Sequence, residues 1–139
     1  MITIDEMEEM LEEISRELPP EFYKELNGGI LLLPDLKISP EAIDDDLYTM
    51  GEYRYSPSMG RYIIIYYGSF RRLYGHMTGE QLKTRLRETL YHEFTHHMES
   101  LAGERGLEIK DEWELAQYRQ GKMGYRSPKV KRAWDAHTK

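Results

Sequence analysis

The 139-residue sequence contains no cysteine. Disulfide bonds, zinc sites with thiolate ligands, iron–sulfur clusters and thiol catalysis are therefore excluded together. Any metal ion that the protein binds must be held by histidine and carboxylate side chains. The sequence has five histidines and 25 aspartate and glutamate residues to supply them.

Long hydrophobic runs are also missing. The longest apolar run covers residues 62–67, whereas a membrane-spanning helix needs about 20 such residues. The first residues are acidic, which is not the pattern of a signal peptide. Hydrophobic residues make up 40% of the chain and charged residues 32%. We therefore expect a globular protein in the cytoplasm, with no membrane partner.

Basic residues are scarce in the first part of the chain. Residues 1–50 carry 14 acidic and 3 basic side chains, whereas residues 121–139 carry six basic side chains and one acidic one. The overall pI is about 5.4, and nucleic-acid-binding domains usually have a high pI. We therefore expect no nucleic-acid partner. The sequence predicts one domain over residues 1–120, followed by a basic C-terminal tail over residues 121–139.

Periodicity and turn residues predict an α+β fold, in which a small mixed sheet packs against a long helix and flanking helices. Thr3 and Glu6 form a predicted capping box at the start of a helix that Pro19 ends. Thr78 and Gln81 form a second one, before the longest helical pattern. The expected helices cover residues 3–18, 21–26, 78–102 and 111–120, and the expected strands cover residues 30–33, 48–55 and 61–67. The connection at residues 34–46 is expected to be a loop or a broken helix, and the one at residues 71–77 a polar, aromatic segment.

The long predicted helix contains the motif His92-Glu93-x-x-His96. Residues four apart lie one helical turn apart on nearly the same face, so both imidazoles can reach one Zn²⁺ ion. The glutamate beside the first histidine can accept a proton from a metal-bound water. The motif therefore predicts His92 and His96 as zinc ligands and Glu93 as a catalytic general base.

The other three histidines have different expected environments. His97 lies near the centre of the helix's apolar arc, which indicates a core histidine or one that orients the metal ligands. His76 and His137 are expected at the surface. Glu93 also falls inside the apolar arc, where a carboxylate is costly unless it is paired or takes part in chemistry.

The helix with its HExxHH sequence, preceded by the strand at residues 62–67, resembles the zincin metallopeptidases. More narrowly, this segment and the turn at residues 26–29 resemble a small bacterial zincin-like metallopeptidase family, formerly a domain of unknown function. The similarity covers about residues 1–120. It implies a minimal zincin-like fold with His92 and His96 as zinc ligands and Glu93 as general base, acting on a peptide or protein substrate.

The third metal ligand is the point at which the sequence departs from the family pattern HExxHxxGxxD. Glu99 stands at the glycine position and Ala102 at the aspartate position. Residues 106–112 resemble the family's Gly-x-x-Asp-Glu run, which makes Asp111 the first candidate for the third ligand. Glu104 and Glu99 are alternatives, and Asp111 is equally well suited to cap the last predicted helix.

These observations predict a zinc-dependent metallopeptidase-like hydrolase, in which Glu93 activates a metal-bound water to attack a peptide carbonyl. The strand at residues 61–67 is the expected edge for pairing with an extended substrate. The expected donors to the oxyanion are Tyr74, His76, Arg71 or Arg72. Because the chain is short, a catalytically weak or inactive zincin-shaped binding or regulatory module is the alternative; a non-peptidase hydrolase is a third one. The oligomeric state is not predicted.

Overall fold

A capping box begins the first helix, α1 (Ile4–Glu17), as the sequence predicts. The computed structural model describes residues 2–45, 47–105 and 114–118. In it, the Glu6 amide donates to the Thr3 hydroxyl over 3.1 Å, and the Thr3 amide donates to the Glu6 carboxylate over 2.9 Å. The short helix expected next is a 3₁₀ turn, η1 (Pro20–Tyr23).

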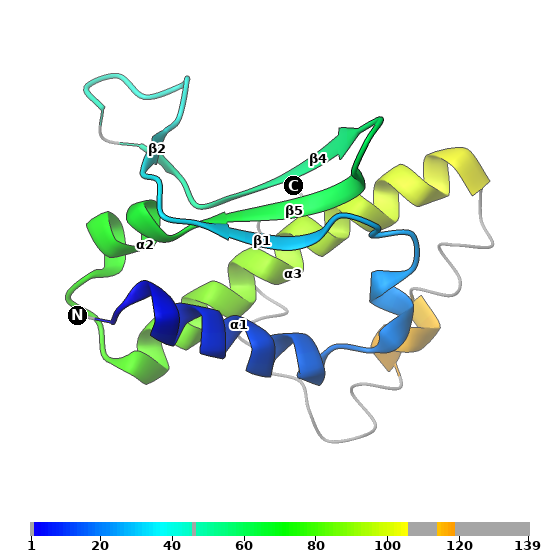
Figure 1. Cartoon of the computed structure of the whole chain (residues 1–139), viewed down its shortest axis with the longest axis horizontal. Helices are drawn as coiled ribbons and strands as arrows, with labels where there is room; N and C mark the ends of the chain where they lie inside the picture. The colour runs from blue at the N-terminus through cyan, green and yellow to red at the C-terminus, as the bar shows by residue number, and fades with distance from the viewer. Residues whose placement is uncertain (1, 46, 106–113, 119–139) are drawn as a thin grey trace.

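A small mixed sheet forms the second layer of the fold (Figure 1). Its strands lie in the order β1 (Gly29–Leu33), β5 (Gly60–Tyr66) and β4 (Gly51–Ser56). β1 runs parallel to β5, and β4 runs antiparallel to it. A separate antiparallel pair, β2 (Lys37–Ile38) and β3 (Tyr48–Thr49), projects beyond the start of β4. The α+β prediction is confirmed.

The prediction that residues 61–67 form an edge strand is wrong. β5 lies between β1 and β4 and is the central strand of the sheet. Its residues are apolar on both faces, which is typical of a central strand. The edge on the side of the long helix is instead β4.

Three other expectations are corrected as well. The strand expected at residues 48–55 is divided between two sheets, as β3 and β4. The connection expected at residues 34–46 contains β2, and the connection expected at residues 71–77 is partly the end of a helix, α2 (Tyr67–Tyr74). No side chain caps the start of α2. Its sequence therefore lacks the signal that identified α1.

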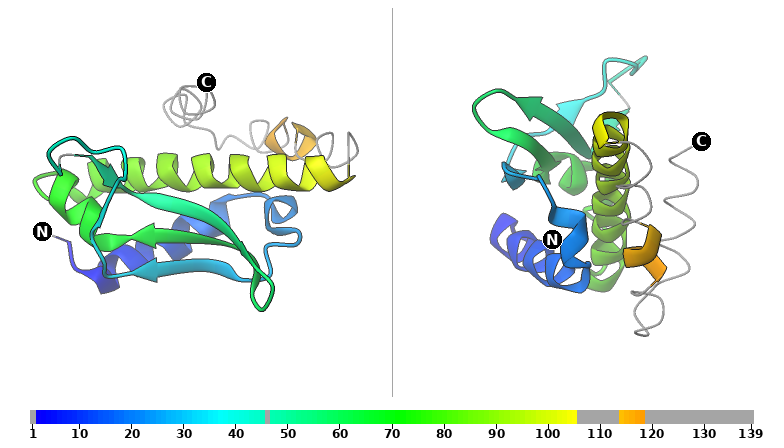
Figure 2. Two further views of the ribbon diagram at one scale, coloured as in Figure 1. Left: turned by 90° about the horizontal axis from the view of Figure 1, so that it is seen from above. Right: turned by 90° about the vertical axis from the view of Figure 1, so that its right-hand side faces the viewer.

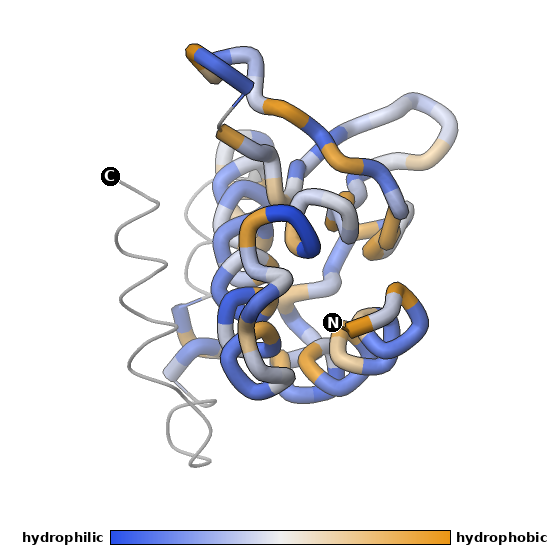
Figure 3. Tube along the Cα trace, turned by 90° about the vertical axis from the view of Figure 1, so that its left-hand side faces the viewer, coloured by the Kyte–Doolittle hydropathy of each residue, from blue (hydrophilic) through white to orange (hydrophobic). Residues whose placement is uncertain are grey.

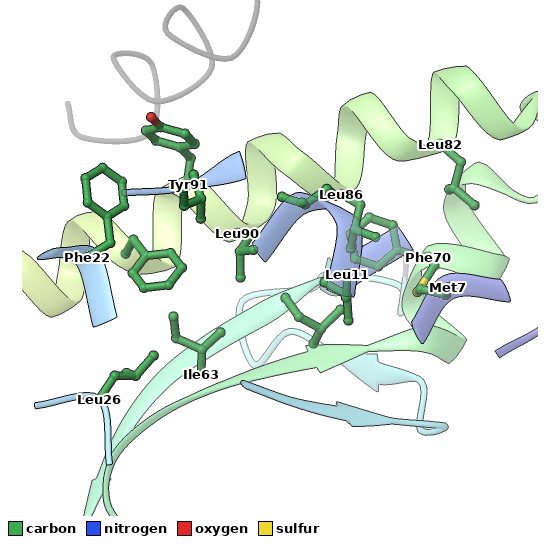
Figure 4. Close-up of a cluster of buried hydrophobic side chains, with 14 of the residues drawn as sticks. Met7, Leu11, Phe22, Leu26, Ile63, Phe70, Leu82, Leu86, Leu90 and Tyr91 are labelled. Carbon is green, nitrogen blue, oxygen red and sulfur yellow. The ribbon is translucent and has the colours of Figure 1, made fainter. Parts of the chain in front are cut away.

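The long helix, α3 (Gly79–Arg105), packs on the sheet beside α1 (Figure 2). The second predicted capping box is present, with bonds of 3.1 and 3.2 Å between Thr78 and Gln81. Buried side chains from α1, α3, β5 and α2 meet in one core (Figure 4). These include Met7, Leu11 and Ile14; Leu82, Leu86, Leu90 and Phe94; Ile63 and Ile65; and Phe70. Each such side chain contributes roughly 1.5–3 kcal/mol by its burial.

The chain beyond α3 is described only at residues 114–118, which are helical and bury Ala116. The rest of the helix expected at 111–120, the basic tail and the domain boundary at residue 120 lie outside the described residues. Although α3 is long enough to cross a bilayer, no helix in the described ranges is also apolar enough to do so.

Two glycines allow a matched test of this packing. A Cβ on Gly68 would lie 2.6 Å from the backbone carbon of Asp35 and the amide nitrogen of Leu36, so the backbone would have to move. A Cβ on Gly103, within α3, would contact nothing within 4 Å. Gly68→Ala is expected to lower the free energy of unfolding by about 1–3 kcal/mol. Gly103→Ala is expected to raise it by about 0.5–1 kcal/mol.

Urea denaturation of the two variants and the wild type measures both changes. Equal effects of the two substitutions would contradict the close approach of α2 to residues 35 and 36.

Candidate functional site

The two histidines of the motif face one another across one turn of α3. Their Nε2 atoms are 3.2 Å apart, with ring centroids 4.6 Å apart and ring planes at 72°. Two nitrogens bound to one tetrahedral zinc at about 2.0–2.1 Å lie about 3.3 Å from each other. The pair therefore already has the separation of two ligands of a single metal ion.

Glu99 lies behind His96, on the side away from His92. Its Oε1 atom is 3.4 Å from the Nδ1 atom of His96. The negative oxygen beside Nδ1 favours a hydrogen on that atom, which leaves the Nε2 lone pair of His96 free for a metal. Glu99 is thus placed to orient His96.

Glu93 is buried beside the histidine pair, with only 5% of its surface exposed. Burial first, and then repulsion from Glu52, raises the pKa of its carboxyl to about 8. The glycine at position 51 gives this side chain its room. A Cβ there would lie 3.3 Å from Cγ of Glu93 and 3.1 Å from Cγ2 of Thr89.

The motif opens onto a cleft of about 650 Å³ between β4 and α3. The lining residues are Gly51, Glu52 and Tyr53 from β4, and His92, Glu93, His96, Glu99 and Ser100 from α3. Three of these eight are glutamates. Carboxylate oxygens and imidazole nitrogens, both present here, are ligand types that zinc accepts.

Glu52 is held as an anion at the edge of this cleft. Burial opposes its ionisation, but hydrogen bonds from Lys37, Tyr66 and Arg54 outweigh burial and lower its pKa. Burial, followed by the bond to Glu52, raises the pKa of Tyr66 to about 12, so its hydroxyl remains a donor. Glu52 is thus a fixed negative charge near Glu93.

The outer edge of β4 presents unpaired backbone groups to the cleft side of the sheet. The Tyr66 amide donates to the Met50 carbonyl over 3.0 Å, and the antiparallel register continues from this pair. In such a ladder, alternate residues point their N–H and C=O groups away from the partner strand. For β4 these are Gly51, Tyr53 and Tyr55, and no further strand pairs with them in the described part of the chain.

His97 lies in the core, as its position in the apolar arc predicts. It is fully buried, and its Nε2 atom is 2.7 Å from the Lys24 carbonyl oxygen, which can only accept. Nε2 therefore carries the hydrogen, and Nδ1 accepts from the Tyr53 hydroxyl over 2.7 Å. Burial lowers the pKa of His97. The neutral ring ties β4 to α3 beside the cleft.

The two alternative third ligands within the described residues are engaged elsewhere. Glu104 pairs with Arg61, whose Nε also donates to the Ser100 hydroxyl over 3.1 Å. Glu99 contacts Nδ1 of His96, as described above. No group of three or more histidine and acidic side chains suited to a metal ion occurs among the described residues. Asp111 lies outside them.

The expected oxyanion donors do not line the cleft. Tyr74 packs against Phe70 and Arg85, with a ring-centroid distance of 5.9 Å to Phe70. Arg72 donates to the Tyr48 hydroxyl over 3.2 Å. His76 is exposed, as expected. His137 lies outside the described residues.

Tyr53 and Glu52 reach the site without any prior signal in the sequence. They lie about 40 residues before the motif and join it only through the pairing of β4 with β5. No periodicity in the sequence marks them, because they are adjacent residues on a strand and point to opposite faces of the sheet.

The chain is similar to a solved structure. A solved structure of a conserved hypothetical protein from Thermus thermophilus aligns with a TM-score of 0.62 and 32% sequence identity, covering 73% of this chain and 99% of that one. The chain belongs to the same protein family as that protein. The description of this relative assigns it no activity. No protein-family model and no curated protein matches the chain.

The raised pKa of Glu93 predicts a pH dependence of stability for the metal-free protein. Between the ordinary pKa of 4.5 and the folded-state pKa of about 8, folded Glu93 holds a proton that the unfolded chain has lost. The contribution of this proton to the free energy of unfolding is therefore complete below pH 4.5. It is lost as pH rises through about 8, by about 1 kcal/mol per pH unit.

Urea unfolding between pH 5 and pH 8 in the presence of a chelator measures this slope. Glu93→Gln, which removes the ionisable group, is expected to flatten it. Identical slopes for the variant and the wild type would show that Glu93 titrates normally.

Proposed function

We propose that the protein is a zinc-dependent metallopeptidase-like hydrolase, of the small bacterial zincin-like type that its sequence resembles. The observation that carries the proposal is the 3.2 Å separation of the His92 and His96 Nε2 atoms beside a buried glutamate. Both histidines and Glu93 line the same cleft. The cysteine-free sequence suits a reducing compartment, and a cytoplasmic location is part of the proposal.

Each residue of the motif has a distinct role in this proposal. His92 and His96 hold the zinc ion, and Glu99 orients His96 through Nδ1. When bound, zinc would supply a Lewis acid that acidifies water and polarises a peptide carbonyl. Glu93 accepts the proton from the attacking water and passes it to the departing amine.

The substrate in this proposal is an extended peptide or protein segment. It pairs with the outer edge of β4, and not with residues 61–67, which the sequence predicted as the edge for substrate pairing. The free backbone groups of Gly51 and Tyr53 belong to residues that line the same cleft as Glu93. An added strand is a common way to bind an extended peptide.

The alternative function, a catalytically weak binding or regulatory module, is favoured by one observation. Within the described ranges, no third ligand joins the histidine pair. Catalytic zinc sites usually have three protein ligands. We propose Asp111 as the third zinc ligand, on the resemblance stated for residues 106–112. Whether Asp111 binds zinc decides between the two functions.

Replacing Glu93 tests the catalytic proposal directly. Glu93→Gln preserves the shape of the side chain but removes the base, so it is expected to retain zinc and to lower peptide hydrolysis by about 10²–10⁴-fold. The measurement is cleavage of an unstructured protein such as casein, with bound zinc determined on the same samples. Undiminished cleavage by the variant would exclude Glu93 as the base, and zinc binding without any cleavage by the wild type would favour the module.

Zinc affinity identifies the third ligand. Asp111→Asn is expected to weaken zinc binding by about tenfold or more, because a ligand is lost. Glu104→Gln is the matched control and is expected to change affinity little, because Arg61 already holds Glu104. Competition with a chromogenic chelator measures both. If only Glu104→Gln weakened zinc binding, Glu104 and not Asp111 would be the third ligand.

A further inference from the structure

Exposed apolar side chains gather on one projecting segment of the molecule. This segment, here named the β2–β3 arm, comprises residues 35–45 and 47–49. Nine large hydrophobic side chains are exposed in the described part of the chain, and four of them lie on the arm: Leu36, Ile38, Leu47 and Ile43. Ile43 is the most exposed of the nine, at 89%. Figure 3 shows the hydrophobic stretches along this projection.

The base of the arm is attached firmly to the body of the protein. The Gly68 amide donates to the Asp35 carbonyl over 3.0 Å, and the Lys37 amide donates to the Ser69 hydroxyl over 3.0 Å. The Lys37 ammonium also pairs with Glu52, which lines the cleft. These contacts fix the base of the arm relative to α2 and β4.

The arm continues directly into the open edge beside the candidate centre. β3 ends at Thr49, and β4 starts at Gly51. No strand of the described residues pairs with the outer edge of β4. Figure 1 shows the arm projecting beyond this end of β4. An extended chain that pairs with β4, in either direction, therefore passes the arm at one end.

The charge of the arm restricts the chemistry of what it contacts. Its described residues include four acidic side chains, Asp35, Glu41, Asp44 and Asp45, and one basic side chain, Lys37. Apolar side chains with acidic neighbours are complementary to a polypeptide that is apolar and basic. They are poorly suited to an anionic membrane surface.

We propose that the β2–β3 arm selects the substrate by binding apolar side chains of an extended, basic polypeptide segment whose backbone pairs with β4. The inference rests on the proposed function because it uses the same edge strand. It adds the substrate class, a segment with exposed hydrophobic residues and net positive charge, as found in unfolded proteins. It also assigns Ile43 and Leu47 as specificity-determining residues that do not touch the metal ligands.

Binding measured without turnover tests the arm. The background is Glu93→Gln, and the probe is a fluorescein-labelled 12-residue peptide of alternating leucine, valine and lysine, read by fluorescence anisotropy. Adding Ile43→Ser and Leu47→Ser together is expected to weaken binding about tenfold or more. Met59→Ser is the matched control, because Met59 is 39% exposed in the turn at the other end of β4; it is expected to leave binding unchanged.

A second probe tests the charge preference. The same peptide with aspartate in place of lysine is expected to bind at least about tenfold more weakly. Equal binding of the double variant and the Met59→Ser control would overturn the proposal. The proposal would also be overturned if the double variant still bound the peptide but no longer self-associated. The same holds if the double variant still bound the peptide but no longer bound neutral lipid vesicles.

The outcomes separate this inference from the proposed hydrolase. Peptide binding that depends on the arm, together with no zinc-dependent cleavage in the wild type, supports the arm and contradicts the hydrolase. Cleavage that depends on Glu93 but has the same KM in the arm variant supports the hydrolase and overturns the arm.

Discussion

The rotational setting of α3 is the constraint on which both the core and the candidate metal centre depend. Leu86, Leu90 and Phe94 are fully buried on one side of this helix. Each residue turns the helix by about 100°, so His92 and His96 necessarily project beside that apolar side. They emerge where β4 passes, at the cleft. Core packing therefore sets the direction of the two imidazoles, and the site needs no separate scaffold.

The carboxyl of Glu93 is buried at a position where apolar side chains are normally found. It sits one residue from His92 and almost fully within the core-facing side, next to the fixed charge of Glu52. Gly51 leaves space for it by bringing the backbone of β4 close to α3 without a side chain. A buried carboxylate at this position is unfavourable for folding, and the proposed proton transfer is the role that it would serve.

Local signals in the sequence predicted local structure well. Both capping boxes form, because each needs only residues three apart. The spacing of His92 and His96 predicted their convergence for the same reason. The order of strands was not predictable in this way, since β5 becomes central only through pairing with β1 on one side and β4 on the other.

The residues that complete the cleft were missed for the same physical reason. The contact of Tyr53 with His97 joins positions 44 apart in sequence, and Glu52 is organised by Lys37 and Tyr66 from other strands. Helix α2 was missed because no side chain caps its first turn. In contrast, the burial of His97 followed from its place in the apolar arc. Long-range pairing, rather than helix periodicity, was the missing information.

The proposed function depends on His92 and His96 binding one metal ion together. Zinc K-edge X-ray absorption on protein purified without added metal, with zinc content determined on the same sample, tests it most directly. We expect one zinc per chain with two imidazole nitrogens at about 2.0–2.1 Å. This zinc is expected to be lost in His92→Ala and in His96→Ala and kept in His76→Ala. Protein without stoichiometric zinc, or zinc retained equally by all three variants, would contradict it.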